Sequence, residues 1–207
     1  MENLIIKPTT IFTDIGGVML TNGWDHIGRG RAIQHFNLDP VETQERHHLT
    51  FDTYESGKIT LDEYLTRVVF YENRKFSKQD FRSFMFEQSQ PIPEMLALLR
   101  GIKEKYRIKI AVVSNEGREL NNYRINKFKL NEFVDFFISS CFVHFRKPDT
   151  DIFKVALDIA QVSPDQVIYL EDRPMFVQVA ETLGIRGIHH QDFNTTKQQL
   201  TAFGWFL

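Results

Sequence analysis

Residues 11–20 read IFTDIGGVML, and this short stretch carries the clearest signal for a parallel β-sheet. The run 10–14 is rich in β-branched and aromatic residues, which favours a strand. Asp14 stands where this strand is expected to end, and Gly16 and Gly17 follow it. Parallel sheets bind ligands beyond the carboxyl ends of their strands. The pattern therefore makes Asp14 a candidate functional carboxylate.

Four further runs of the same kind recur along the chain. We predict strands at residues 10–14, 108–113, 136–139, 167–170 and 185–188. Residues 95–102, 152–159 and 177–183 carry the 3.6-residue apolar periodicity of helices. Alternating strands and helices predict right-handed crossovers. The expected fold class is α/β, a Rossmann-like parallel sheet with helices on both faces.

One long interval, residues 21–90, contains helix signals but no strand-like run. Thr60 and Glu63 fit a capping box, and Ser77 precedes Asp80 at the same spacing. Pro91 and Pro93 then mark a return to the α/β part. We predict a discontinuous α/β core, residues 1–20 and 91–207, and an inserted all-helical cap, residues 21–90.

The composition argues against several classes of partner. The chain of 207 residues has 25 Lys and Arg against 27 Asp and Glu. This balance gives no excess of positive charge that would favour binding to nucleic acid or to an anionic membrane. No apolar run approaches the roughly 20 residues of a membrane helix. The single cysteine, Cys141, excludes an internal disulfide and a cysteine-based zinc site. We expect a cytoplasmic monomer or homodimer that acts on a small molecule.

Polar side chains follow several of the predicted strands, at the point where each strand ends. They are Asp14, the pair Ser114 and Asn115, the pair Glu171 and Asp172, and Lys147 after the third strand. Because these strand ends meet at one edge of the sheet, the side chains are expected to share one crevice. Acids, a hydroxyl and a lysine suit phosphoryl chemistry on Mg²⁺, whose preferred ligands are oxygens.

These ordered motifs resemble those of the haloacid dehalogenase (HAD) superfamily of hydrolases. FTDIGGVML is similar to its first motif, VVSN to its second, RKPDTDIF to its third and YLEDRP to its fourth. The likeness covers nearly the whole chain, with the helical interval where one branch carries its cap. The chain is most similar to this capped branch, subfamily I, whose first motif reads D-x-G-[GN]-V and which includes sugar phosphatases similar to glucose-1-phosphatase.

The resemblance implies a Mg²⁺-dependent phosphatase that hydrolyses a small phosphorylated metabolite, with a sugar phosphate as one candidate. Asp14 would be the nucleophile that forms an aspartyl-phosphate, and Lys147 would neutralise the charge. The metal ligands would be Asp14, the backbone carbonyl of Gly16, Asp172 and Glu171. The substrate and phosphate would be bound by Ser114, Asn115, Gly16, Gly17 and Trp24.

Two residues depart from the family pattern. Most phosphatases of the superfamily have a second aspartate two positions after the nucleophile, where it protonates the leaving group, and Gly16 cannot do this. Phe176 stands where relatives often place Asn or Asp, which help to hold the lysine. Three interpretations stay open: a phosphatase for leaving groups that need little protonation, a haloacid dehalogenase that uses no metal, or a weakly active or inactive binding protein on the same scaffold.

Some residues of the cap interval are weaker candidates. Trp24, Asp25 and His26 are candidates for substrate selection or for the missing proton donor, and Arg29 and Arg31 for cations facing the substrate. Two histidine doublets, 47–48 and 189–190, are expected at the surface or at helix caps, because neighbouring residues do not share one face of a helix or strand.

Overall fold

Five parallel strands form the single sheet of the computed structural model, which describes residues 7–206. The strands are β1 (Thr10–Thr13), β2 (Lys109–Ser114), β3 (Phe136–Ser139), β4 (Val167–Glu171) and β5 (Arg186–His189), in the order β3-β2-β1-β4-β5. All five predicted strands are confirmed to within one residue. β1 lies at the centre, so Asp14 follows the middle strand of the sheet. Residues 1–6 of the predicted core lie outside the described part.

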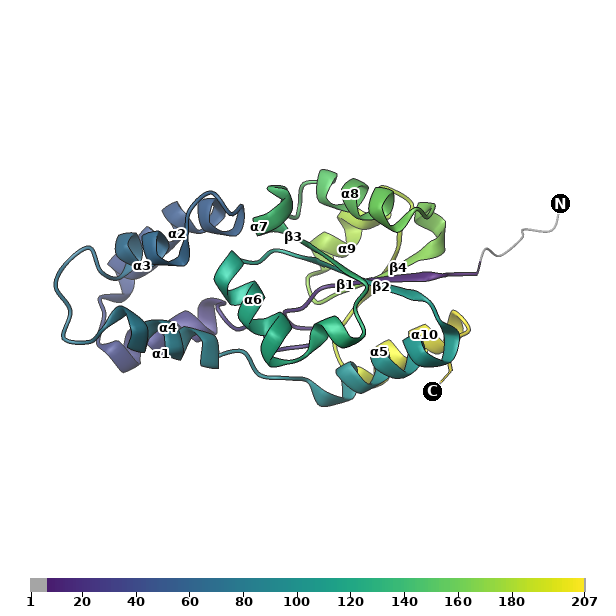
Figure 1. The fold of residues 1–207 in the computed structure, drawn as a ribbon, viewed down its shortest axis with the longest axis horizontal. Coiled ribbons are helices and arrows are strands. Elements are labelled where there is room, and N and C mark those ends of the chain that lie inside the picture. Colours follow the sequence, from purple (N-terminus) through teal and green to yellow (C-terminus); the bar gives the residue numbers. More distant parts are fainter. Residues whose placement is uncertain (1–6, 207) are drawn as a thin grey trace.

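Helices cover both faces of the sheet, which confirms the predicted α/β, Rossmann-like class (Figure 1). Helices α5 (Pro93–Tyr106) and α10 (Phe193–Ala202) cover one face, and α8 (Asp151–Ala160) and α9 (Pro174–Glu181) cover the other. Successive strand residues alternate between two buried clusters. Ile11 packs in the cluster of α5, and Phe12 packs in that of α8. This alternation fixes which way each strand faces.

Helix α6 (Arg118–Lys127) and helix α10 were not among the helices predicted from periodicity. The sequence of α6, RELNNYRINK, has few apolar residues, yet Leu120, Asn121 and Arg124 are buried. Two of these three buried residues, Asn121 and Arg124, are polar or charged. The helix therefore has no apolar stripe from which the sequence could predict it. The short elements η1 (Leu130–Glu132), α7 (Ser140–Val143) and η2 (Pro164–Gln166) complete this part of the chain.

Between β1 and α5 the chain forms four helices that lie beyond one end of the sheet (Figure 1). They are α1 (His26–Phe36), α2 (Pro40–Glu55), α3 (Leu61–Val68) and α4 (Lys78–Glu87), which we call the helical insertion. Both predicted capping signals are present, at Thr60 with Glu63 and at Ser77 with Asp80. The helices share a core of their own, which includes Trp24, Tyr64 and Phe81.

The two chain segments that join the insertion to the sheet lie side by side. The Thr21 N–H donates to the Gln90 carbonyl at 2.8 Å. Arg124 of α6 ties both segments to the core: its Nε donates to the Ser89 hydroxyl and its Nη2 to the Asn22 carbonyl, each at 2.9 Å. Among the described residues, no helix combines the length and the apolar character that crossing a bilayer requires.

Candidate active site

Three carboxylates meet at the carboxyl ends of β1 and β4. One oxygen each from Asp14, Glu171 and Asp172 lies within 4.8 Å of the others. The register pairs Thr13 of β1 with Leu170 of β4, and the Asp14 N–H donates to the Leu170 carbonyl at 2.9 Å. The parallel pairing of two neighbouring strands therefore brings these acids together.

Lys147 is the cation of this group and is almost fully buried. Its Nζ lies 2.6 Å from Glu171 Oε2 and 3.4 Å from Asp14 Oδ2. Burial alone would lower the pKa of Lys147, but Asp14 and Glu171 together raise it above its ordinary value. The lysine therefore stays charged between the two carboxylates.

Tyr169 of β4, which the sequence did not single out, completes the surroundings of the lysine. Lys147 Nζ donates to the Tyr169 hydroxyl at 3.0 Å, and that hydroxyl donates to Glu171 Oε2 at 2.5 Å. Phe176 offers no polar atom, as expected, but its ring centroid lies 5.1 Å from Lys147 Nζ. Tyr169 and Glu171 thus provide the polar contacts that position 176 lacks.

The Asn22 side chain lies beside Gly16. A Cβ at Gly16 would lie 2.8 Å from Asn22 Oδ1, so Asn22 occupies the place of a side chain at this position. Asn22 Nδ2 in turn donates to Asp172 Oδ2 at 2.8 Å. Gly17 has a φ of +68°, and a Cβ there would lie 2.1 Å from Asp172 Oδ2. Both glycines let Asn22 and Asp172 approach the loop after β1.

The second motif contributes two side chains with different surroundings. Ser114 is buried at the end of β2, and its hydroxyl partly opposes the rise that burial causes in the pKa of Asp14. Asn115 uses its side-chain oxygen and nitrogen on Lys147: the Lys147 N–H donates to Oδ1 and Nδ2 donates to the Lys147 carbonyl, both at 2.8 Å. The Asn115 side chain therefore holds the Lys147 loop in place.

The carboxylate oxygens of Asp14, Glu171 and Asp172 are suitable ligands for a divalent cation. Asp172 Oδ1 is buried and has no hydrogen-bond partner among the described residues. Burial raises the pKa of Asp14, Lys147 opposes this, and the Glu171 charge adds to the rise. A cation at this group would favour the ionised carboxylates and satisfy the unpaired oxygen. The residues present therefore fit Mg²⁺, which prefers oxygen ligands.

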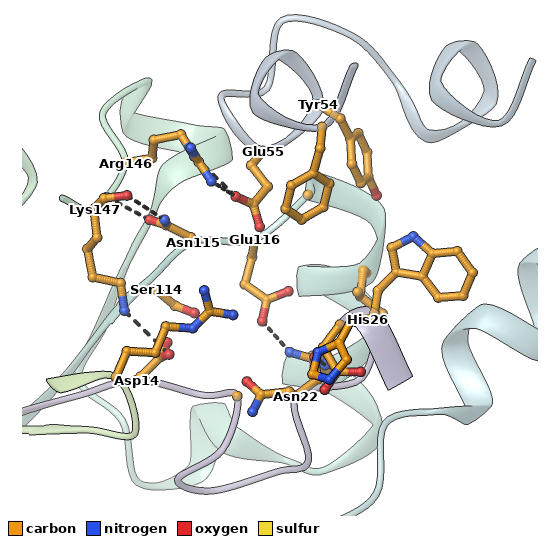
Figure 2. Close-up of a pocket in the computed structure, with 18 of the residues that line it drawn as sticks. Asp14, Asn22, His26, Tyr54, Glu55, Ser114, Asn115, Glu116, Arg146 and Lys147 are labelled. Atoms are coloured by element: carbon orange, nitrogen blue, oxygen red, sulfur yellow. Dashed lines mark hydrogen bonds and ion pairs between the residues drawn. The ribbon is translucent and has the colours of Figure 1, made fainter. Parts of the chain in front are cut away.

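A cavity of about 320 Å³ lies over Asp14 and is lined partly by residues of the helical insertion. In Figure 2, Asp14, Ser114 and Lys147 line one side, and Tyr54 and His26 lie across from them. Two ion pairs join the walls: Arg146 Nη2 lies 2.5 Å from Glu55 Oε2, and Arg146 Nη1 lies 2.7 Å from Asp52 Oδ1. The structure therefore holds the insertion over the strand ends.

The structure places some of the weaker candidate residues of the insertion in the cavity and leaves one outside it. Trp24, Asp25, His26 and Arg29 all line the cavity, whereas Arg31 does not. The Trp24 indole N–H is already bonded to the Tyr64 hydroxyl, and the Asp25 carboxylate accepts from the first amides of α1. Both groups therefore take part in hydrogen bonds within the insertion. His26 is exposed at the rim.

The expectation that both histidine doublets lie at the surface or at helix caps is wrong for His47, which lies within α2. His47 is buried and lines the cavity, whereas His48 is exposed. His190 is also buried, and its Nδ1 contacts the Thr196 hydroxyl at 2.7 Å. Alternate faces of α2 explain the first doublet, because only one of two neighbouring residues can face the core of the insertion.

Glu116 is a further cavity residue that the sequence did not mark. It stands between the two walls in Figure 2 and forms a buried ion pair with Arg124. Burial raises the pKa of Glu116 from 4.5 to about 7, although Arg124 lowers it. Asp14 and Glu55 add to the rise, because their charges repel that of Glu116.

The chain belongs to the haloacid dehalogenase-like hydrolases, because the family profile of that description matches residues 31–189. Two curated relatives are similar over part of their length. Flavin mononucleotide hydrolase 1 (chloroplastic) of Arabidopsis thaliana is 24% identical over 77% of this chain and 64% of its own length. A phosphorylated carbohydrates phosphatase of Thermotoga maritima is 25% identical over 56% of each chain. The chain thus spans less than two thirds of these relatives.

Solved structures of the family share the fold over most of their length. The HAD-family enzyme BT-2542 of Bacteroides thetaiotaomicron, in complex with magnesium and inorganic phosphate, has a TM-score of 0.71 at 22% identity, covering 87% of this chain and 93% of its own. A 2-haloacid dehalogenase of Pseudomonas syringae has a TM-score of 0.64 at 16% identity, covering 95% and 99%. The fold is therefore common to metal-binding and dehalogenating relatives.

Proposed function

We propose that this hydrolase is a Mg²⁺-dependent phosphatase that cleaves a small phosphate monoester, such as a sugar phosphate, through Asp14. The observation that carries the proposal is the group of Asp14, Glu171 and Asp172, whose oxygens lie within 4.8 Å beside the Lys147 ammonium. An acid group of this kind suits a metal and a phosphoryl group. A dehalogenase has no use for it, because halide leaves carbon without a metal.

In the proposed reaction, an Asp14 carboxylate oxygen attacks phosphorus, and the bond from phosphorus to the leaving oxygen breaks. Lys147 and the Ser114 hydroxyl stabilise the charge of the transferring group. Water then attacks the aspartyl-phosphate, which releases phosphate and restores the carboxylate. Mg²⁺, held by Asp14, Asp172, Glu171 and the Gly16 carbonyl, would supply charge neutralisation for the phosphate oxygens.

The leaving group determines which esters suit this site. Gly16 provides no acid, and Asn22, which fills the adjacent space, has a neutral amide that cannot act as a general acid at neutral pH. Protonation of the leaving group by a general acid typically raises the reaction rate by about 10² to 10⁴-fold. We therefore propose substrates whose leaving group departs with little protonation, such as anomeric, acyl or aryl phosphates, and we expect the enzyme to act in the cytoplasm as a monomer or homodimer.

Asp14→Asn tests the proposal directly. Turnover of aryl and sugar phosphates with Mg²⁺ should fall by at least about 10³-fold, because the nucleophile is lost. Asp158→Asn is the matched control, since Asp158 is an exposed carboxylate of α8. Turnover that survives Asp14→Asn would contradict the mechanism.

Metal dependence separates the phosphatase from the dehalogenase. EDTA should abolish phosphate release and added Mg²⁺ should restore it, whereas halide release from 2-haloacids should be absent with or without metal. A wild-type protein that turns over neither class of substrate would instead support a binding protein on a hydrolase scaffold.

A further inference from the structure

Three buried side chains of the helical insertion form a hydrogen-bonded chain that ends at the cavity. The Trp24 indole N–H donates to the Tyr64 hydroxyl at 3.0 Å, and that oxygen lies 2.7 Å from His47 Nδ1. Trp24, Tyr64 and His47 are 6%, 0% and 7% exposed, respectively. Trp24 and His47 both line the cavity over Asp14.

One tautomer of the His47 ring lets every donor and acceptor in this chain of hydrogen bonds find a partner. An indole N–H can only donate, so the Tyr64 oxygen accepts from Trp24 and its own proton is free to donate to His47 Nδ1. Burial raises the pKa of Tyr64, which therefore keeps that proton. Burial, with Arg29 and His48 nearby, lowers the pKa of His47 to about 3. The ring is neutral and carries its proton on Nε2.

The Nε2–H of His47 has no hydrogen-bond partner within residues 7–206. His47 lines the cavity, so a ring N–H that makes no contact with the described residues is available to a ligand or to water there. His47 belongs to α2 of the insertion, whereas Asp14 follows β1 of the sheet, and both residues line the same cavity.

The groups around His47 also present donors and an aromatic ring. Arg29 is held by two hydrogen bonds, Nε to Gln44 Oε1 at 3.2 Å and Nη1 to the Trp24 carbonyl at 3.0 Å, and its Nη2 has no partner among the described residues. The Phe51 ring lies 4.3 Å from that of His47. The nearby acids are engaged elsewhere, Asp25 with the amides of α1 and Glu55 with Arg146.

We propose that His47 is a specificity-determining residue whose Nε2–H donates to an acceptor oxygen of the leaving group. The substrate class is then a phosphate ester whose leaving group carries hydroxyl or carbonyl oxygens, as a phosphorylated sugar does, rather than a bare aryl or alkyl group. This inference rests on the proposed phosphatase function and adds the recognition of the leaving group to it.

Three variants and two substrate classes test the role of His47. His47→Leu removes the donor, His47→Gln keeps an N–H near the place of Nε2, and His48→Leu changes the exposed neighbour as a control. The ratio of kcat/KM for hexose phosphates to kcat/KM for phenyl phosphate should fall about 10- to 100-fold in His47→Leu. The ratio should recover largely in His47→Gln and stay unchanged in His48→Leu.

Hexose phosphates that each lack one hydroxyl locate the acceptor. One deoxy analogue should be turned over equally by the wild type and His47→Leu, because its missing oxygen is the one that His47 binds. An unchanged substrate ratio in His47→Leu, or no rescue by His47→Gln in a variant that unfolds like the wild type, would overturn the proposal.

Turnover of phenyl phosphate by the wild type reports the phosphatase function separately, since this ester has no such acceptor. If no ester is turned over, the phosphatase proposal fails, and calorimetric binding of hexose phosphates still tests His47. Affinity for the wild type that falls about 10- to 100-fold in His47→Leu would support the recognition role. Equal affinities, or no binding at all, would reject it.

Discussion

The buried polar contacts of the two cavity walls differ in kind. The wall at the strand ends consists of charges, with Lys147 between Asp14 and Glu171. The wall of the insertion also includes charged residues, Arg29 and Glu55. Its buried part, which we call the neutral wall, is a chain of neutral hydrogen bonds that runs from Trp24 through Tyr64 to His47. Charges suit a phosphoryl group and a metal, whereas neutral donors distinguish one leaving group from another. The comparison suggests that reaction and selection are divided between the two walls.

The largest effect is expected from Lys147→Met, which removes the cation between the buried carboxylates of Asp14 and Glu171. The free energy of unfolding should fall by about 3–5 kcal/mol, because breaking a buried ion pair leaves uncompensated charge. Phosphate release should fall at least about 10²-fold as well. Urea unfolding and turnover measure the two losses.

The matched control for this variant is Lys103→Met, at a surface pair in which Nζ lies 2.6 Å from Asp135 Oδ2. It should cost about 1 kcal/mol or less, since exposed pairs are screened by water. Equal losses in the two variants would show that the strand-end charges are not specially coupled.

Glu116→Gln, at the junction of the two walls, should change how stability depends on pH. The folded pKa of about 7 exceeds the unfolded value of 4.5, so the folded state holds the proton more tightly and loses this advantage as pH rises through that window. Relative to wild type, the variant should gain about 3 kcal/mol in unfolding free energy between pH 4.5 and 7. Urea unfolding at several pH values measures this, and a constant difference would contradict it.

The smallest effect is expected on the neutral wall. Tyr64→Phe leaves the Trp24 N–H and His47 Nδ1 unpaired, which should lower the free energy of unfolding by about 1–3 kcal/mol. Tyr54→Phe is a close control, because the Tyr54 ring stacks on that of Tyr64 at 4.8 Å but its buried hydroxyl has no partner among the described residues. Tyr54→Phe should leave the free energy of unfolding unchanged or raise it slightly. Thermal unfolding of the two variants and of the wild type measures the difference.

The sequence predicted the charged wall well, for a physical reason. Strand runs are short and locally encoded, and the residue after each strand falls at one edge of a parallel sheet, so residue order alone groups Asp14, Lys147 and Asp172. Tyr169 was missed because a tyrosine inside a strand also fits ordinary core packing. Its role depends on the distance between its hydroxyl and Lys147 Nζ, which no local pattern encodes.

The neutral wall could not be predicted in the same way. His47, Tyr64 and Trp24 lie on α2, α3 and the segment before α1, and only the packing of these helices brings their polar atoms together. Arg124 was likewise hidden in a polar helix, although it holds both connecting segments. Helix packing depends on side chains that are distant in sequence, so residue spacing carries little information about it.

The sequence by itself determined the parallel sheet, the helical character of the insertion and the set of acids at the strand ends, because strand periodicity and capping boxes are local signals. The resemblance to the hydrolase family also showed that Gly16 stands where most phosphatases of that family have an aspartate. Only the tertiary structure showed what lies beside Gly16, namely the Asn22 side chain, whose Nδ2 donates to Asp172 Oδ2. The same packing set the tautomer of His47, because a hydrogen-bonded chain across three segments exists only once the helices have come together.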